Sequence, residues 1–237
     1  MNLILLDDQQ AVAEHRYRLT PRQAHHVDTV LGAKPGDALR CGLLNGPSGS
    51  GVLRHEGAFR ELEVNLAEAP PAPLPLTLIL ALPRPKMLKR MAIDASSLGI
   101  KRIVLLNSWK VDKSYWQTPE LKAELLEDKL RLGLEQAGDT MLPEIILAKR
   151  FKPFVEDELS DLAGDSRCIL ADPAGADAMP CDLTEPVTLA VGPEGGWTEY
   201  ERDMLLARQF SCHHLGQRIL RSETALPTLV GRLMRLI

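Results

Sequence analysis

The sequence predicts an α/β fold in which a small β-rich domain precedes a larger domain with a largely parallel sheet. Short apolar segments broken by glycines fill residues 1–70, and prolines then concentrate at 70–75. Beyond them, apolar runs alternate with helical patterns, which is typical of parallel strands joined by helices. We therefore expect a domain over 1–70, a linker over 71–75 and a domain over 76–237.

The first domain is expected to contain several short strands, because its apolar segments are brief and bounded by turn residues. These segments cover 3–6, 38–44, 51–53 and 61–66. The second domain is expected to begin with a strand at 76–82, a helix at 86–98 and a strand at 103–106. A longer helix at 119–137 and strands at 168–170 and 187–191 follow.

A glycine-rich loop, Gly192-Pro193-Glu194-Gly195-Gly196, directly follows the apolar strand 187–191. The next residues, Thr198-Glu199-Tyr200-Glu201, form a capping-box pattern, so the loop leads into a helix. A strand, a glycine loop and a helix together indicate a nucleotide-like ligand, although the loop could equally be a plain connection. The loop has no lysine and neither phosphate-binding glycine pattern, so a neutral or cationic nucleoside fits better than ATP.

A second turn, residues 215–221, precedes the last predicted helix. Leu226, Leu229, Val230 and Leu233 have the spacing of one apolar helix face. Ser222 or Thr224 is expected to be the N-cap of this helix. Arg221 and Glu223 beside it would form either a local ion pair or polar groups of a site.

The two turns in this order, GPEGG followed by LGQRILRSETA, resemble the signature of the RsmE family of 16S rRNA uridine-N3 methyltransferases in the SPOUT superfamily. The resemblance implies a C-terminal SPOUT α/β-knot (trefoil-knot) methyltransferase domain and S-adenosylmethionine as the cofactor. It also implies a homodimer. A knot would not follow from pattern rules, because threaded connections are rare.

The resemblance implies that backbone groups of the two turns hold the cofactor, with Leu170 from an earlier strand covering the adenine. The cofactor-binding residues expected from it are Leu170, Val191, Gly192, Pro193, Glu194, Gly195, Gly196, Leu215, Gly216, Ile219, Leu220, Arg221 and Thr224. Arg221 is the expected catalytic residue, because a guanidinium stabilises the charge that spreads over uracil when N3 loses its proton. Glu223 is expected to orient Arg221 or to accept that proton.

The segment from Ala24 to Ala38 resembles the PUA-like β-barrel of the same family, which implies RNA binding by the first domain. The expected partner is 16S rRNA or the small ribosomal subunit. The expected RNA-binding residues are His25, His26, Arg84, Lys86, Lys89, Arg90 and Lys110. The formal net charge of −4 excludes a uniformly basic RNA binder, and the basic cluster at 84–102 could instead be a solvated helix face.

The chain departs from the family pattern at Gly32, Ser97, Lys110 and Asp139. These departures leave the cofactor signature intact but bear on the RNA target. Two alternatives to the 16S rRNA enzyme therefore remain: a divergent SPOUT methyltransferase with another target, and a non-catalytic RNA- or ribosome-binding protein.

No metal site is expected, because the four cysteines lack paired spacing and the adjacent histidines lack further ligands. The chain has no apolar run of membrane-spanning length and no signal-peptide pattern at its start, which favours a cytoplasmic enzyme without membrane contact. The apolar face of the last helix (Leu226, Val230, Leu233, Ile237) could be the dimer surface or part of the core.

Overall fold

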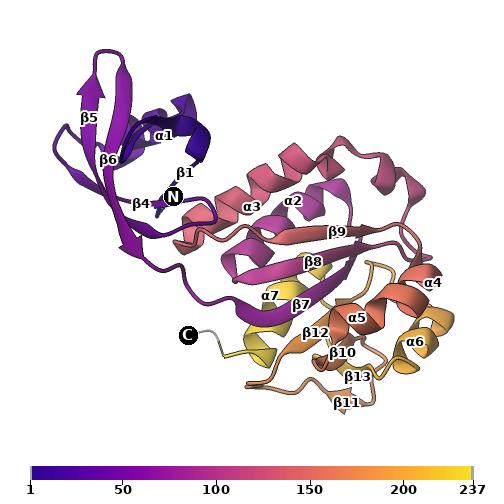
Figure 1. Cartoon of the computed structure of the whole chain (residues 1–237). Helices are drawn as coiled ribbons and strands as arrows, with labels where there is room; N and C mark the ends of the chain where they lie inside the picture. Colours follow the sequence, from indigo (N-terminus) through magenta and orange to yellow (C-terminus); the bar gives the residue numbers. More distant parts are fainter. Residues whose placement is uncertain (1, 236–237) are drawn as a thin grey trace. The chain divides into compact units, whose positions relative to one another are not determined.

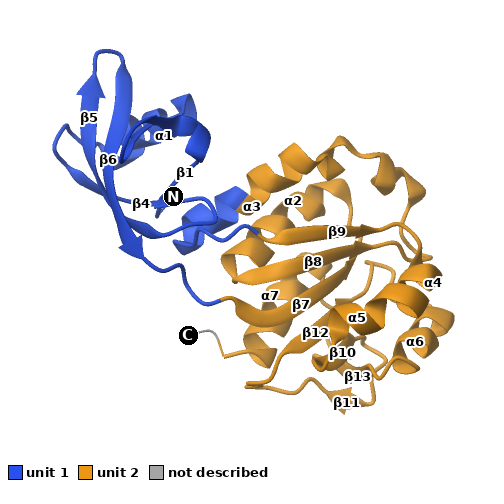
Figure 2. Ribbon diagram, viewed as in Figure 1, with its two compact units in different colours: residues 1–72, 131–142 blue, residues 73–130, 143–237 orange. Residues whose placement is uncertain are grey.

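The computed structural model describes residues 2–235, and the chain divides into two compact units. Unit 1 consists of residues 1–72 and 131–142, and unit 2 consists of residues 73–130 and 143–237 (Figure 2). The α/β class predicted from the sequence is confirmed.

Unit 1 is built on a six-stranded sheet in the order β1-β4-β5-β6-β3-β2. Figure 1 labels β1, β4, β5 and β6 of this sheet. The strands are β1 (Ile4–Leu6), β2 (Ala11–Ala13), β3 (Arg16–Arg18), β4 (Ala38–Leu43), β5 (Ser48–Glu56) and β6 (Phe59–Glu68). Strand β1 pairs with β4 in parallel, and the other neighbours are antiparallel. All four strand segments predicted for this part of the chain lie in the sheet, whereas β2 and β3 were not predicted.

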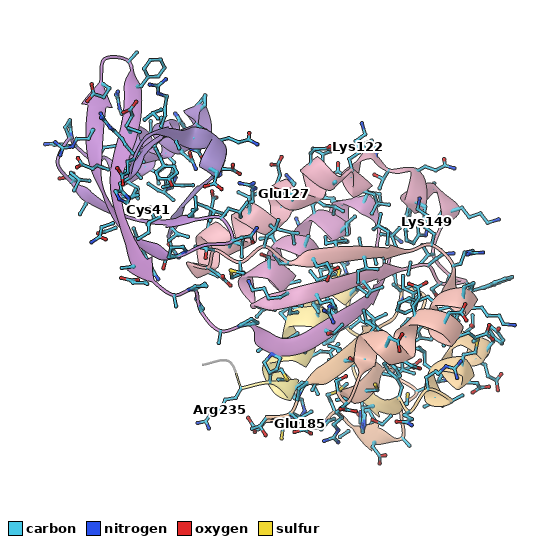
Figure 3. The ribbon with its side chains drawn as sticks, viewed as in Figure 1. Cys41, Lys122, Glu127, Lys149, Glu185 and Arg235 are labelled. Carbon is cyan, nitrogen blue, oxygen red and sulfur yellow. The ribbon has the colours of Figure 1, made fainter. Side chains whose placement is uncertain are left out.

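The core of unit 1 forms because apolar side chains on successive strands point to the same face of the sheet. Leu6, Leu53 and Leu62 are fully buried there together with Cys41. Figure 3 labels Cys41 within unit 1, and burial raises the pKa of its thiol to about 12. Helix α1 (Pro21–His26) begins with a capping box at Thr20 and continues as a π-helical segment η2 (Val27–Leu31).

Unit 2 contains a seven-stranded sheet in the order β11-β13-β10-β12-β7-β8-β9, and every neighbouring pair is parallel. Its strands are β7 (Leu74–Ala81), β8 (Ile100–Leu106), β9 (Glu144–Ala148), β10 (Arg167–Ala171), β11 (Asp177–Ala178), β12 (Val187–Val191) and β13 (Ser211–His214). All five residues of β12 are buried, because helices cover both faces of the sheet (Figure 1). The predicted parallel sheet is confirmed.

Within the described residues, six α-helices lie wholly or partly in unit 2. They are α2 (Pro85–Ser97), α3 (Ala123–Ala137), α4 (Phe151–Pro153), α5 (Leu159–Ala163), α6 (Glu199–Leu206) and α7 (Ser222–Leu233). A π-helical segment, η5 (Phe154–Glu158), joins α4 to α5, and none of this stretch was predicted. The helix predicted at 119–137 begins only at Ala123, because Pro119–Leu121 forms a separate 3-10 turn followed by an extended Lys122.

One prediction about the last helix was wrong, and one alternative that the sequence left open is decided. The N-cap of α7 is Arg221, in extended conformation and without a side-chain cap, so neither Ser222 nor Thr224 fills that position. The apolar face is core: Leu226, Val230 and Leu233 are fully buried within this single chain. Helix α7 packs against α2, so this face is not available as a dimer surface. Ile237, assigned to the same face, lies outside the described residues.

Within residues 2–235, no helix has the length and apolar character needed to cross a bilayer. The same residues contain no group of three or more histidine, cysteine or acidic side chains placed to hold a metal ion.

Candidate functional site at the carboxyl edge of the parallel sheet

A pocket of about 840 Å³ opens in unit 2 at the carboxyl ends of its central strands. Its walls are the segments that follow β7, β12, β10 and β13, which are neighbours in the sheet. Parallel strands end at one edge, so these segments meet although more than one hundred residues separate the first from the last. Both turns identified in the sequence line this one pocket.

Most of the predicted site residues come together in this pocket. Those that line it are Arg84, Lys86, Arg90, Val191, Gly192, Pro193, Glu194, Gly195, Gly196, Leu215, Gly216, Ile219, Leu220, Arg221 and Glu223. Leu170 is fully buried in β10 and does not line the pocket, whereas its neighbour Ala171 does. Thr224 is exposed on the first turn of α7, outside the lining.

The predicted RNA-binding residues are more dispersed. The ammonium of Lys89 lies 2.8 Å from a carboxylate oxygen of Glu120, outside the pocket lining. His25 and His26 belong to helix α1 of unit 1, where His25 is exposed and His26 is half-buried. The Nε2 atom of His26 has no hydrogen-bond partner among the described residues.

The glycine loop is fixed by contacts on both of its sides. A Cβ atom on Gly192 would come within 2.8 Å of Nε1 of Trp197, so only glycine lets this indole pack against the loop. The Nε atom of Arg84 lies 2.6 Å from a carboxylate oxygen of Glu194. Lys110 donates from Nζ to the carbonyl oxygen of Gly195 at 2.8 Å. Arg84 and Lys110 therefore hold the loop as well as adding charge beside it.

The helix that follows the loop begins at the predicted capping box, and Glu201 does more than cap it. One carboxylate oxygen of Glu201 accepts hydrogen bonds from the backbone N–H and the hydroxyl of Thr198 at 2.9 and 2.8 Å. The other accepts the backbone N–H of Trp109 at 2.7 Å. Because Glu201 is only 2% exposed, these donors satisfy a carboxylate that is almost fully withdrawn from water.

The second turn is open to solvent and is shaped by local contacts. Gly216 has a φ of +120°, a conformation that side-chain-bearing residues rarely adopt, and its N–H donates to Nδ1 of His214 at 2.9 Å. Arg221 and Glu223 both line the pocket. Within residues 2–235, neither side chain makes a hydrogen bond or an ion pair, so the expected contact between them is absent.

The pocket lining also includes four polar residues that were not predicted as site residues, namely Asp172, His213, Arg218 and Ser222. Asp172 accepts the N–H of Ala174 at 2.8 Å and lies 3.5 Å from a guanidinium nitrogen of Arg202. His213 contacts the hydroxyl of Ser211 at 2.9 Å through Nε2. The available signal for Asp172 was its place directly after an apolar strand, at the edge where the two turns were expected.

The sequence is similar to those of known RNA methyltransferases. A model of the RNA methyltransferase domain family matches residues 70–234. The chain is 32% identical to the ribosomal RNA small subunit methyltransferase E of Treponema pallidum, over 95% of this chain and 87% of that protein. It is 28% identical to the protein of the same name from Synechocystis, over 93% and 73% of the two chains.

The fold is shared with solved structures. A ribosomal RNA small subunit methyltransferase E from Neisseria gonorrhoeae, bound to S-adenosyl methionine, aligns with a TM-score of 0.73 and 21% identity, covering 98% of this chain and 96% of that one. A probable rRNA methyltransferase from Porphyromonas gingivalis aligns with a TM-score of 0.72 and 20% identity, covering 98% and 99%.

Replacement of Glu201 by alanine is expected to destabilise the protein by about 2–4 kcal/mol, because the N–H of Thr198 at the helix start and the N–H of Trp109 both lose their acceptor. Urea unfolding followed by circular dichroism measures this change. Glu199→Ala, on the exposed side of the same helical turn, is the matched control and is expected to change stability by less than about 0.5 kcal/mol. Equal effects of the two substitutions would contradict the role assigned to Glu201.

Proposed function

We propose that this chain, which belongs to the ribosomal RNA small subunit methyltransferase E family of RNA methyltransferases, methylates N3 of one uridine in 16S rRNA with S-adenosylmethionine as the methyl donor. Family membership makes the protein a small-subunit rRNA methyltransferase. The observation that carries the proposal is that the turns 192–196 and 215–221 line one pocket. Their resemblance to the family signature supports N3 of uridine as the target atom.

The residues of the pocket fit S-adenosylmethionine. The volume of about 840 Å³ lies within the usual range for sites that enclose a ligand of this size. Gly192 and Gly216 bring backbone close to the pocket interior without a side chain in the way. Nε1 of the buried Trp197 has no partner among the described residues, which leaves an N–H donor beside Gly192 for a polar ligand atom. The neighbour from Neisseria gonorrhoeae was solved with this cofactor.

In the proposed mechanism, the bound cofactor supplies a methyl group made electrophilic by its sulfonium. The residues of both turns hold the donor and the uracil in line, and such positioning provides much of the acceleration in two-substrate reactions. Arg221 lines the pocket with an uncompensated guanidinium, and we assign it to the negative charge that develops on the uracil carbonyl oxygens. Glu223 is half-buried in the same pocket and makes no ion pair with Arg221 in this structure, so we assign it either to orient Arg221 once the RNA is bound or to accept the N3 proton.

The finer features of the fold belong to the same proposal. We assign a trefoil knot to the carboxyl-terminal part of unit 2, supported by turn 215–221 meeting turn 192–196 and by α7 packing against α2. We assign residues 1–70 to a PUA-like RNA-binding β-barrel, supported by the six-stranded sheet of unit 1. The methyltransferase domain would then cover 76–237 after a linker at 71–75.

The RNA would contact the basic residues around the pocket. Lys86 and Arg221 line it and are the strongest candidates, since they carry no ion pair with another described residue, whereas Arg90 is attracted to the carboxylate of Asp94. Arg84 and Lys110 already hold the glycine loop, and Lys89 is paired with Glu120. A cytoplasmic location follows from a ribosomal RNA substrate. His25 and His26 would contact RNA from unit 1.

The identity of the target is tested by mass mapping of rRNA from a strain that lacks this gene. We expect one uridine of 16S rRNA to lose its methyl group and to regain it when the gene is restored. An unchanged 16S rRNA together with a lost methyl group in another RNA would favour a divergent target, which the departures at Gly32, Ser97, Lys110 and Asp139 leave open.

Arg221→Ala is expected to lower kcat about 100-fold or more, because stabilisation of charge in the transition state is lost. The dissociation constant for S-adenosylmethionine, measured by calorimetry, should stay within about twofold, since we assign cofactor binding to backbone groups of the turns. Arg235→Ala, an exposed arginine beyond the far end of α7, is the matched control and should retain the wild-type rate. Wild-type turnover by Arg221→Ala would remove Arg221 from the mechanism.

We also propose that the enzyme is a homodimer, as the family resemblance implies. The buried face of α7 excludes that surface, so the interface must lie elsewhere on the chain. Static light scattering at micromolar concentration is expected to give twice the chain mass of 26.2 kDa, and the mass of a single chain would contradict this proposal.

A further inference from the structure

A four-residue turn after strand β8, Ser108 to Val111, has an unusual residue at its tip. Val111 donates its N–H to the carbonyl oxygen of Ser108 at 3.0 Å, which places Trp109 and Lys110 at the two central positions. Both ends of the turn are buried, whereas Trp109 is 84% exposed. The tips of turns normally carry small polar residues. The large indole of Trp109 lies in water, so it contributes no hydrophobic stabilisation to this fold.

The turn is held in place independently of its tip. The Trp109 N–H is bound by the buried Glu201, and Lys110 reaches the carbonyl oxygen of Gly195. At the start of the segment, Asn107 donates its N–H to Ala148 and accepts the indole N–H of Trp116, each at 2.8 Å. The backbone that carries the exposed ring of Trp109 is therefore held in place by hydrogen bonds.

The position of the turn links it to the pocket. Strand β8 is the neighbour of β7, and its carboxyl end lies at the sheet edge where the pocket opens. Gly195, which Lys110 contacts, is part of the pocket lining. Trp109 therefore directly precedes Lys110 in the sequence, and the side chain of Lys110 contacts the lining of the pocket that we propose binds the methyl donor.

The chemistry of the turn favours RNA as the occupant. Residues 107–113 carry Lys110 and Lys113 against one acid, Asp112, so the aromatic surface lies in a locally positive segment. Exposed aromatic rings flanked by cations bind single-stranded nucleic acid, since every base has a face that stacks while the cations attract phosphates. A flat ring on a fixed backbone loses little conformational entropy on stacking.

We propose that Trp109 is a stacking platform for an unpaired base of the RNA substrate, close to the nucleotide that enters the pocket. This inference rests on the proposed function and deepens it, because it names a residue that positions the substrate. Trp109 is a positioning residue, since it acts on a base other than the reacting one.

Steady-state kinetics on small ribosomal subunits from the deletion strain test this role. Trp109→Ala is expected to raise KM for the subunits roughly 5- to 150-fold, the range that corresponds to the loss of one base–aromatic stack. The kcat and the dissociation constant for S-adenosylmethionine should change far less. Trp109→Phe keeps an aromatic face and is expected to restore most of the affinity. Leu206→Ala, a partly exposed apolar residue at the far end of α6, is the matched control and should behave as wild type.

A second measurement does not depend on methyl transfer. Addition of a short single-stranded uridine-rich RNA should quench the tryptophan fluorescence of the wild-type protein. Trp109→Phe should lose this quenching, although Trp116 and Trp197 remain. Retained quenching in Trp109→Phe, or an unchanged KM in Trp109→Ala, would overturn the inference.

Two further outcomes separate the possible failures. If Trp109→Ala alters the mass measured by light scattering but leaves RNA affinity unchanged, the ring is a contact between copies of this chain, and RNA stacking is wrong. If the wild-type protein shows RNA quenching that requires Trp109 but methylates no small-subunit rRNA, the proposed function fails while the stacking role stands.

Discussion

A buried carboxylate must be surrounded by donors, and Glu201 meets this requirement with groups from two distant parts of the chain. Its bonds to Thr198 fix where α6 begins and so where the glycine loop must end. Its bond to the N–H of Trp109 fixes the turn after β8 against the same helix. The loop, the helix start and the neighbouring turn are therefore set together by one side chain.

The features that could be predicted from the sequence were those encoded by local patterns. Strand β12 has the predicted limits because five consecutive apolar residues are covered on both faces, and the capping box at Thr198 is a short-range signal. The proximity of the two turns could also be predicted, since parallel strands end at a common edge of the sheet. Asp172 and Trp109 belong to no periodic sequence pattern. Their place in or beside the pocket depends on neighbours in the folded chain, which only the structure supplies.

In α7, tertiary packing overrode one local preference and decided a question that the sequence left open. Ser222 is a favourable N-cap type, yet it is buried as the first helical residue and Arg221 takes the cap position with extended backbone. The apolar stripe of this helix was compatible with core or interface from its spacing alone. Packing against α2 decides the question, because Leu226, Val230 and Leu233 have no surface left for a partner.

The basic side chains around the pocket differ in whether they form an ion pair. Arg84 forms an ion pair with Glu194, so its charge is compensated, whereas Lys110 bonds the neutral carbonyl of Gly195 and keeps its charge. Lys86 and Arg221 line the same pocket without an ion pair to another described residue. A chain with a net charge of −4 gains RNA affinity only where positive charge is concentrated and uncompensated. Arg84 thus mainly shapes the glycine loop, and under the proposed function Lys86, Lys110 and Arg221 are the cations available to the phosphates of the RNA.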